Sequence, residues 1–147
     1  MNPETALPSH LAAIVSDFEV CEGREKLELL LEYARNFPTF PLELSAQLEV
    51  EEVPECMTPV QMIAQTEDSR MYFYFEVPAE SPTIRGFAAV VMEGLNGATP
   101  EEVLAIPPEF YMQMGLQEVL SAQRLNGMAA LMAHVKRRAA SEMVGRA

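Results

Sequence analysis

The sequence predicts an α+β protein in which helices precede and follow a small antiparallel sheet. Apolar residues recur at helical spacing up to about position 35, alternate with polar residues between positions 48 and 77, and return to helical spacing after position 81. Such a segregation of periods along the chain is typical of α+β folds. We expect a three-stranded antiparallel sheet covered by helices, with two helices before the sheet and three or four after it, in a single domain spanning residues 1–147.

Two helices are predicted before the sheet. The first can begin at Ser9, a residue type that often caps helix N-termini. The second should end near Asn36 because Pro38 and Pro41 follow it, and residues 38–44 then form an extended connection. The apolar positions of these helices are Leu7, Leu11, Ile14, Val15 and Phe18, followed by Leu27, Leu30, Leu31 and Ala34.

The middle of the chain predicts a meander of three strands. A short, weak strand around Leu48 and Val50 leads to a second strand over Val60–Gln65, and a polar turn at Glu67–Arg70 joins this to the third. Apolar and more polar side chains alternate along the third strand, so one face of the sheet is apolar and needs a cover. The residues expected on the apolar face are Met71, Phe73, Phe75 and Val77, and those expected on the other face are Tyr72, Tyr74 and Glu76.

The segment after the sheet predicts the helix that covers it. Ser81 is a favourable N-cap, Pro82 suits the first helical position, and Gly97 is placed to end the helix. A shorter helix should follow Thr99, which can form a capping box with Glu102. The apolar residues of the covering helix are Ile84, Phe87, Ala88, Val91, Met92 and Leu95. The other helical segments expected are a turn or two within residues 109–114 and a last helix with Leu125, Met128, Met132 and Val135 on one face.

Charge limits the classes of partner. Ten lysines and arginines against 22 aspartates and glutamates give the 147-residue chain a formal charge of -12. Such a surface repels phosphate backbones and anionic lipid, so we expect neither nucleic acid nor membranes as partners, whereas a basic protein is favoured. No run approaches the roughly 20 apolar residues of a membrane-spanning helix. The first residues lack the regions of a signal peptide, and we expect a cytoplasmic protein.

The cysteines and histidines do not form a metal-binding pattern. Cys21, Cys56, His10 and His134 are far apart in the sequence, whereas structural zinc sites use closely spaced pairs. Glycine-rich phosphate loops and nucleophile elbows are also missing from the sequence. We therefore expect no metal and no cofactor. A Cys56–His134 protease pair is disfavoured because His134 lies near the basic end of the last helix, where a surface role is simpler.

Cys56 lies in a short segment between Pro54 and Pro59, just before the second predicted strand. Because proline fixes φ and has no amide donor, this segment should form a loop outside the helices and the sheet. A thiol at the tip of such a loop can meet another molecule, although an intracellular cysteine is also often a small buried apolar residue. Negative neighbours raise the pKa of a thiol, so the adjacent glutamates favour an acceptor that reacts inside a partner's site over an independent nucleophile.

Several segments resemble the SufE family in their sequence and in their order along the chain. Members of this family are sulfur acceptors that work with cysteine desulfurases in iron–sulfur cluster assembly. The resemblance runs from Leu11 to Ala139 and includes the cysteine loop before a hairpin. The other matching segments are Phe37-Pro38, Ile84–Val90, Thr99–Val103 and Leu120–Gly127. Many members follow the cysteine with Gln-Ser and then Val-Trp, whereas this chain has Met57–Val60 there and Gln61 in the aromatic place.

The resemblance implies specific roles for a few residues. Cys56 would carry the transferred sulfur as a persulfide, and Arg124, Arg85 and Glu80 would support it near the loop. Cys21 matches no functional position and is interpreted as structural. The partners implied are a pyridoxal-phosphate cysteine desulfurase, which this protein would stimulate, and an iron–sulfur scaffold as the downstream acceptor. The protein itself would be a carrier rather than a stand-alone enzyme.

A second hypothesis stays open at this point. A small acidic binding chaperone with a Met-rich apolar surface would account for the charge, the length and the ten methionines. Methionines that fill the core would remove this hypothesis' main support. The thiol distinguishes the two functions, because a chaperone should keep its activity without Cys56.

Overall fold

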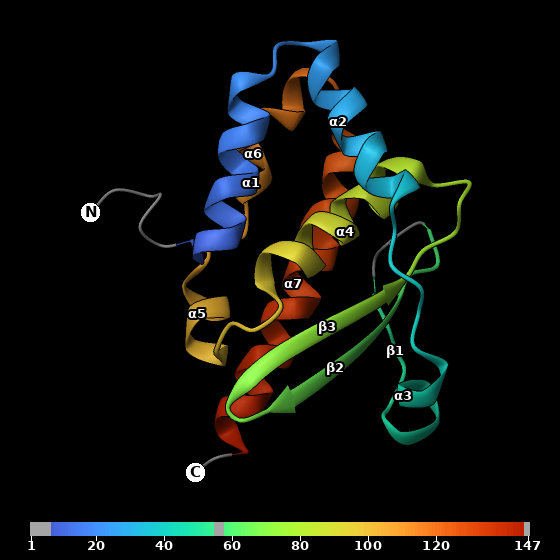
Figure 1. Ribbon diagram of the computed structural model, residues 1–147, viewed down its shortest axis with the longest axis vertical. Helices are drawn as coiled ribbons and strands as arrows, with labels where there is room; N and C mark the ends of the chain where they lie inside the picture. Colours follow the sequence, from blue (N-terminus) through green and yellow to red (C-terminus); the bar gives the residue numbers. More distant parts are fainter. Residues whose placement is uncertain (1–6, 55–57, 146–147) are drawn as a thin grey trace.

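The computed structural model describes residues 7–54 and 58–145 and has the expected α+β architecture (Figure 1). Among the described helices, none combines the length and the apolar character that a membrane span requires. The elements before and within the sheet are α1 (Ser9–Val20), α2 (Arg24–Arg35), α3 (Leu42–Gln47), β1 (Glu51–Glu52), β2 (Gln61–Glu67) and β3 (Arg70–Glu76). The elements after it are α4 (Pro82–Leu95), α5 (Pro100–Ala105), α6 (Phe110–Gln113), the 3-10 helix η2 (Leu116–Glu118) and α7 (Ala122–Val144).

The sheet is antiparallel with the strand order β1-β2-β3, as predicted. β2 and β3 pair from Gln61 opposite Glu76 to the turn, where Asp68 and Ser69 both have positive φ. Two positive φ values are typical of two-residue hairpin turns, whose twist matches that of the strands. The alternation in β3 is confirmed, since its predicted apolar face is buried.

The outer edge of β3 is covered by the segment that follows α4. The Asn96 side chain accepts a hydrogen bond from the Phe73 amide at 2.7 Å and donates one to the Phe73 carbonyl at 3.2 Å. Met71 exchanges backbone hydrogen bonds with Gly97 and Ala98, each 2.8 Å long. These contacts satisfy groups that would otherwise leave an open strand edge.

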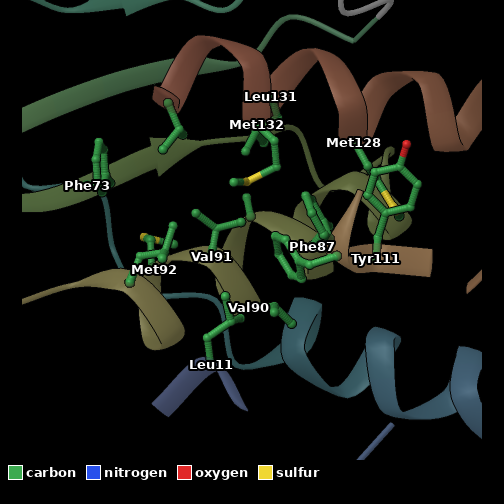
Figure 2. Packing of buried hydrophobic residues seen from close by; sticks show 14 of the residues in the cluster. Leu11, Phe73, Phe87, Val90, Val91, Met92, Tyr111, Met128, Leu131 and Met132 are labelled. Atoms are coloured by element: carbon green, nitrogen blue, oxygen red, sulfur yellow. The ribbon is translucent and has the colours of Figure 1, made fainter. Parts of the chain in front are cut away.

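Helix α4 is the central element of the core. Figure 1 shows it between the sheet and the helices α1 and α2, and it contacts α1, α2, α7 and β3. Figure 2 shows its side chains Phe87, Val90 and Val91 among residues from other elements, including Leu11 of α1 and Phe73 of β3. Every apolar residue predicted for the covering helix is buried, so this prediction is confirmed.

Three local expectations differ from the structure. Residues 42–44 were expected to be extended but begin α3, because Pro41 occupies the N-cap and its carbonyl accepts a hydrogen bond from the Ser45 amide. The first strand forms at Glu51–Glu52 instead of Leu48 and Val50, where β1 can pair with β2. Ser9 is the first residue of α1, and the N-cap is Pro8. Proline has no hydroxyl, so no side chain caps this helix.

The buried face of α2 also differs from the prediction. Lys26 is buried at 5% exposure, whereas Leu27 and Leu31 are only half-buried. The Lys26 ammonium donates hydrogen bonds to the carbonyls of Phe18, at 2.7 Å, and Met114, at 3.2 Å. A buried cation is tolerated when such acceptors replace its water. Lys26 therefore links α2 to the end of α1 and to the segment after α6.

Candidate functional site

The described residues on the two sides of Cys56 are joined by a backbone hydrogen bond next to the sheet. The Val53 amide donates a hydrogen bond to the Val60 carbonyl at 2.9 Å, and both side chains are buried. Pro54 and Pro59, the prolines next to this pair, are exposed. Cys56 itself lies outside the described residues, so the site is built from the residues on either side of it.

Strand β1, which leads into the Cys56 segment, is held to α7 by contacts between Glu51 and two side chains of the helix. The Glu51 carboxylate lies 3.0 Å from Nε2 of His134 and 3.3 Å from Nε of Arg138. Arg138 also pairs with Glu142 at 2.8 Å. The expectation that His134 is a surface residue was wrong, because its side chain is only 13% exposed and faces β1. The helix passes beside a strand that is distant in the sequence, and the helical pattern alone does not show this.

The other end of the segment is attached to the start of α4. The hydroxyls of Thr58 and Ser81 are hydrogen-bonded at 2.9 Å. Ser81 occupies the predicted N-cap position, but its side chain makes no capping hydrogen bond. Its hydroxyl instead forms the hydrogen bond to Thr58, the residue two positions after Cys56. The described residues on both sides of Cys56 are thus fixed to the rest of the protein.

A polar recess of about 620 Å³ opens beside Thr58, between the first turns of α4 and α7. Its described lining residues are Thr58, Glu80, Ser81, Thr83, Ile84, Ser121, Gln123, Arg124, Asn126 and Gly127. Hydroxyl, amide and guanidinium groups predominate among them. We call it the α4–α7 recess.

The Arg124 side chain is oriented within the α4–α7 recess by the hydroxyl of Thr83, and its backbone is capped by the hydroxyl of Ser121. Its Nη1 donates a hydrogen bond to Oγ1 of Thr83 at 2.9 Å, and Thr83 is buried at 8% exposure. Its backbone amide donates to the Ser121 hydroxyl, the N-cap of α7, at 3.4 Å. A long cationic side chain on an exposed helix turn is normally free to rotate. Here a buried acceptor restricts the guanidinium.

A second pocket, of about 610 Å³, lies on the other side of Glu80 and includes Val53, Pro59 and Arg85. Glu80 lines both this pocket and the α4–α7 recess. The structure thus brings Arg124 and Glu80 together in one recess that Thr58 also lines, and it places Arg85 in the neighbouring pocket.

The Arg85 side chain contacts three surrounding segments of the chain. Its Nη1 donates to the carbonyl of Val77, and its Nε lies 3.4 Å from the carbonyl of Ala34. Its guanidinium also lies over the Phe37 ring, 4.2 Å from the centroid, in cation–π geometry. Arg85 therefore joins the ends of β3 and α2 to the first turn of α4, next to the residues that flank Cys56.

Sequence reasoning missed the hydroxyl groups of this site. Thr58, Ser81 and Thr83 contact each other or Arg124, yet each is an ordinary loop or helix-start residue in the sequence. The sequence indicated Ser81 as the N-cap of the helix that begins at Pro82, but it did not indicate a role for Thr58 or Thr83. The second cysteine, Cys21, lies at the C-cap of α1, where its thiol contacts the Asp17 carbonyl at 3.4 Å.

The α4–α7 recess suits a small polar or anionic group better than a metal. Arg124 supplies a cation and the hydroxyls supply hydrogen-bond donors, whereas Glu80 is the one carboxylate among the described lining residues. In the described part of the chain, no three histidine, cysteine or acidic side chains are grouped to hold a metal ion. Guanidinium groups favour anions such as a thiolate or persulfide through charge-assisted hydrogen bonds.

Comparisons with known proteins agree with these features. The SufE family model, described as an Fe-S metabolism associated domain, matches residues 12–139. A SufE-like protein of Mycobacterium tuberculosis is 42% identical over 139 residues, which cover 94% of this chain and 96% of that protein. The sulfur acceptor protein CsdE of Escherichia coli is 30% identical over 112 residues, covering 75% of this chain and 74% of that protein.

A solved structure carries the same fold. The solution structure of a hypothetical protein from Thermus thermophilus matches this one with a TM-score of 0.81 and 34% sequence identity, covering 94% of this chain and 98% of that one. The family model and the 42% identical relative both extend over nearly the whole chain, beyond the cysteine segment alone. The chain therefore belongs to the SufE family.

Proposed function

We propose that this protein accepts sulfur from a pyridoxal-phosphate cysteine desulfurase on Cys56 and passes it to an iron–sulfur scaffold. The observation that carries this proposal is the position of the described residues on either side of Cys56. These residues are fixed by the Val53–Val60 pair and the Thr58–Ser81 pair, beside a recess that contains an oriented arginine. Membership of a family described by Fe-S metabolism, and the sulfur acceptor CsdE among the relatives, support the same chemistry.

The proposed transfer is a thiol–persulfide exchange. The Cys56 thiolate attacks the outer sulfur of the persulfide on the desulfurase cysteine. A sulfur–sulfur bond forms on Cys56 while the one on the desulfurase breaks, and the desulfurase cysteine leaves as a thiolate. That thiolate takes up the proton that Cys56 lost. One persulfide replaces another, so the step consumes no oxidant or reductant.

The surrounding residues have distinct proposed roles. Arg124 stabilises the anionic persulfide on Cys56 by charge-assisted hydrogen bonding, and Thr83 orients its guanidinium. Arg85 is a positioning residue that keeps the start of α4 against β3 and α2. Glu80, which is exposed where the two pockets meet, can pair with a cation of the desulfurase.

The chaperone alternative loses its main support in the structure. Six described methionines are buried in the core, and two are exposed. The buried ones are Met62, Met71, Met92, Met114, Met128 and Met132, and the exposed ones are Met112 and Met143. Methionine therefore mainly fills the interior and does not form the apolar surface that holding a client chain requires.

The test compares wild type with Cys56→Ser and Cys21→Ser after incubation with a cysteine desulfurase and cysteine. Wild type and Cys21→Ser should gain roughly 32 Da, one sulfur atom, that reductant removes, and both should stimulate the desulfurase. Cys56→Ser should fold, gain no sulfur and give no stimulation. Sulfur on Cys21, or an adduct that persists in Cys56→Ser, would contradict the assignment of the acceptor.

A further inference from the structure

A third pocket lies away from the Cys56 segment, between α2, β3 and the second half of α4. Its volume is about 530 Å³, within the range of ligand-binding pockets. We call it the α2–α4 pocket. Its described lining residues are Leu29, Glu32, Tyr33, Asn36, Pro38, Tyr74, Ala89, Met92, Glu93 and Asn96. None of them lines the α4–α7 recess, so the two sites are separate.

The α2–α4 pocket combines apolar walls with negative charge. Leu29, Met92 and the rings of Tyr33 and Tyr74 provide apolar and aromatic surface. The charged side chains among its described lining residues are two exposed glutamates, Glu32 and Glu93, and that lining contains no lysine or arginine. A positively charged group with an apolar stem is complementary to such a pocket.

Tyr33 lies in the pocket within the influence of several carboxylates. Burial raises the pKa of its phenol to about 12, with further contributions from the charges of Glu93, Asp17 and Glu32. The same carboxylates that disfavour a phenolate favour a cation at this position. The Tyr33 ring is stacked on Phe18, with centroids 6.1 Å apart, so it presents a fixed aromatic surface.

Helix α4 connects the α2–α4 pocket to the sulfur site. Ser81, at the start of the helix, contacts Thr58, and Asn96, just past its end, lines the pocket. A helix of this length, Pro82–Leu95, spans about 20 Å at 1.5 Å per residue. A protein interface of standard size covers about 800 Å² on each partner, which is about 30 Å across. One partner docked over the Cys56 segment is therefore large enough to reach the pocket.

We propose that the α2–α4 pocket receives an arginine side chain of the desulfurase. This would be a second contact between the two proteins, in addition to the one at the Cys56 segment. This inference rests on the proposed function, which supplies the partner. Arginine fits better than lysine because its planar guanidinium both stacks on aromatic rings and pairs with carboxylates. Its stem packs against Leu29 and Met92, and its head lies between Glu32 and Glu93. The contact strengthens docking and takes no part in the sulfur exchange.

The test uses the full-length double variant Glu32→Gln/Glu93→Gln, with Glu19→Gln/Glu67→Gln as the matched control. Both double variants remove two exposed negative charges, but Glu19 and Glu67 line none of the three pockets. Calorimetric titration with the desulfurase should show affinity about tenfold lower for Glu32→Gln/Glu93→Gln and less than twofold lower for the control. Sulfur loading of Cys56 at saturating desulfurase should be unchanged in both variants. Equal weakening by both pairs, or none by either, overturns the pocket assignment.

A peptide probe makes the test independent of sulfur chemistry. Acetyl-Leu-Arg-Leu-amide should shift the NMR signals of the Tyr33 and Tyr74 rings, and the same peptide with neutral citrulline in place of arginine should shift them much less.

The two proposals can fail separately. If wild type binds desulfurase but gains no sulfur, the proposed function fails, while the titration still measures whether the pocket contributes to binding. If sulfur loading is normal and Glu32→Gln/Glu93→Gln binds desulfurase like wild type, only the pocket assignment fails. A wild-type dimer in sedimentation that Glu32→Gln/Glu93→Gln abolishes would identify a second copy as the occupant and overturn the desulfurase assignment.

Discussion

The substitution Thr83→Val tests whether Arg124 must be oriented for sulfur transfer. Thr83 is buried in the first turn of α4, and its hydroxyl accepts the hydrogen bond from Nη1 of Arg124 at 2.9 Å. Valine has nearly the same shape but cannot accept that bond. Arg124 would then keep its charge and lose its fixed direction toward the α4–α7 recess.

The expected size of the effect follows from this hydrogen bond. Bonds to charged groups contribute about 1.5–3 kcal/mol. Arg124 is exposed, so water replaces much of the lost interaction, and we expect about 1 kcal/mol of transition-state stabilisation to be lost. This corresponds to roughly fivefold slower sulfur transfer. The free energy of unfolding should change by less than about 1 kcal/mol, because the freed guanidinium hydrogen reaches solvent.

The assay measures the rate of Cys56 persulfide formation by intact mass, with Thr83→Ser as the matched control that keeps the hydroxyl. Thr83→Ser should transfer sulfur at nearly the wild-type rate. A double-mutant cycle that combines Thr83→Val with Arg124→Ala tests whether the two residues act together. Two residues that act through one contact have non-additive effects on the transfer rate. Thr83→Val should therefore slow the Arg124→Ala variant little further. A wild-type rate for Thr83→Val, or effects that add in full, would refute the orienting role.

Two further predictions concern the core and the α2–α4 pocket. Gly86→Ala should lower the free energy of unfolding by about 1–3 kcal/mol in urea titrations, because the new Cβ would lie 2.3 Å from the Leu30 carbonyl oxygen and force α2 and α4 apart; Gly145→Ala, whose Cβ meets only ordinary contacts, should be neutral. The pKa of Tyr33, raised from 10.0 to about 12, predicts that stability falls as pH rises from 10 to 12, because the folded protein then holds a proton that the unfolded chain has lost. Burial also raises the pKa of Tyr111, so Tyr33→Phe should reduce this fall and remove only the contribution of Tyr33 to the late part of an absorbance titration of the tyrosines; an unaltered titration would contradict the assignment.

Features set by neighbours in the sequence were predictable. The hairpin of β2 and β3 follows from alternation around a polar turn, and the capping box of Thr99 and Glu102 forms with both of its hydrogen bonds. The buried face of α4 follows from helical spacing. In each case the residues that decide the structure are only a few positions apart, so local physics is sufficient.

Features that depend on distant partners were not predictable. Lys26 is buried because the carbonyl of Met114, 88 positions away, accepts its hydrogen bond. His134 meets Glu51 across the fold, and Arg124 meets Thr83, 41 positions away. A lysine, a histidine or a threonine has the same appearance in a sequence whether its partner is protein or water. Tertiary packing selects these contacts, and no local period indicates them.

The arrangement of contacts around α4 explains why the candidate site should tolerate change in the sequence of the cysteine segment. Ser81, Thr83 and Arg85 stand in or next to the first turn of α4, and each contacts a different part of the chain. Because α4 is packed between the sheet and the surrounding helices, this turn is held by the core and not by the cysteine segment. Conservative changes within the segment that spare Cys56, Thr58 and Val60 should therefore leave Ser81, Thr83 and Arg85 in position. Loss of the core packing of α4 should accordingly impair sulfur transfer more than conservative changes within the segment that spare Cys56.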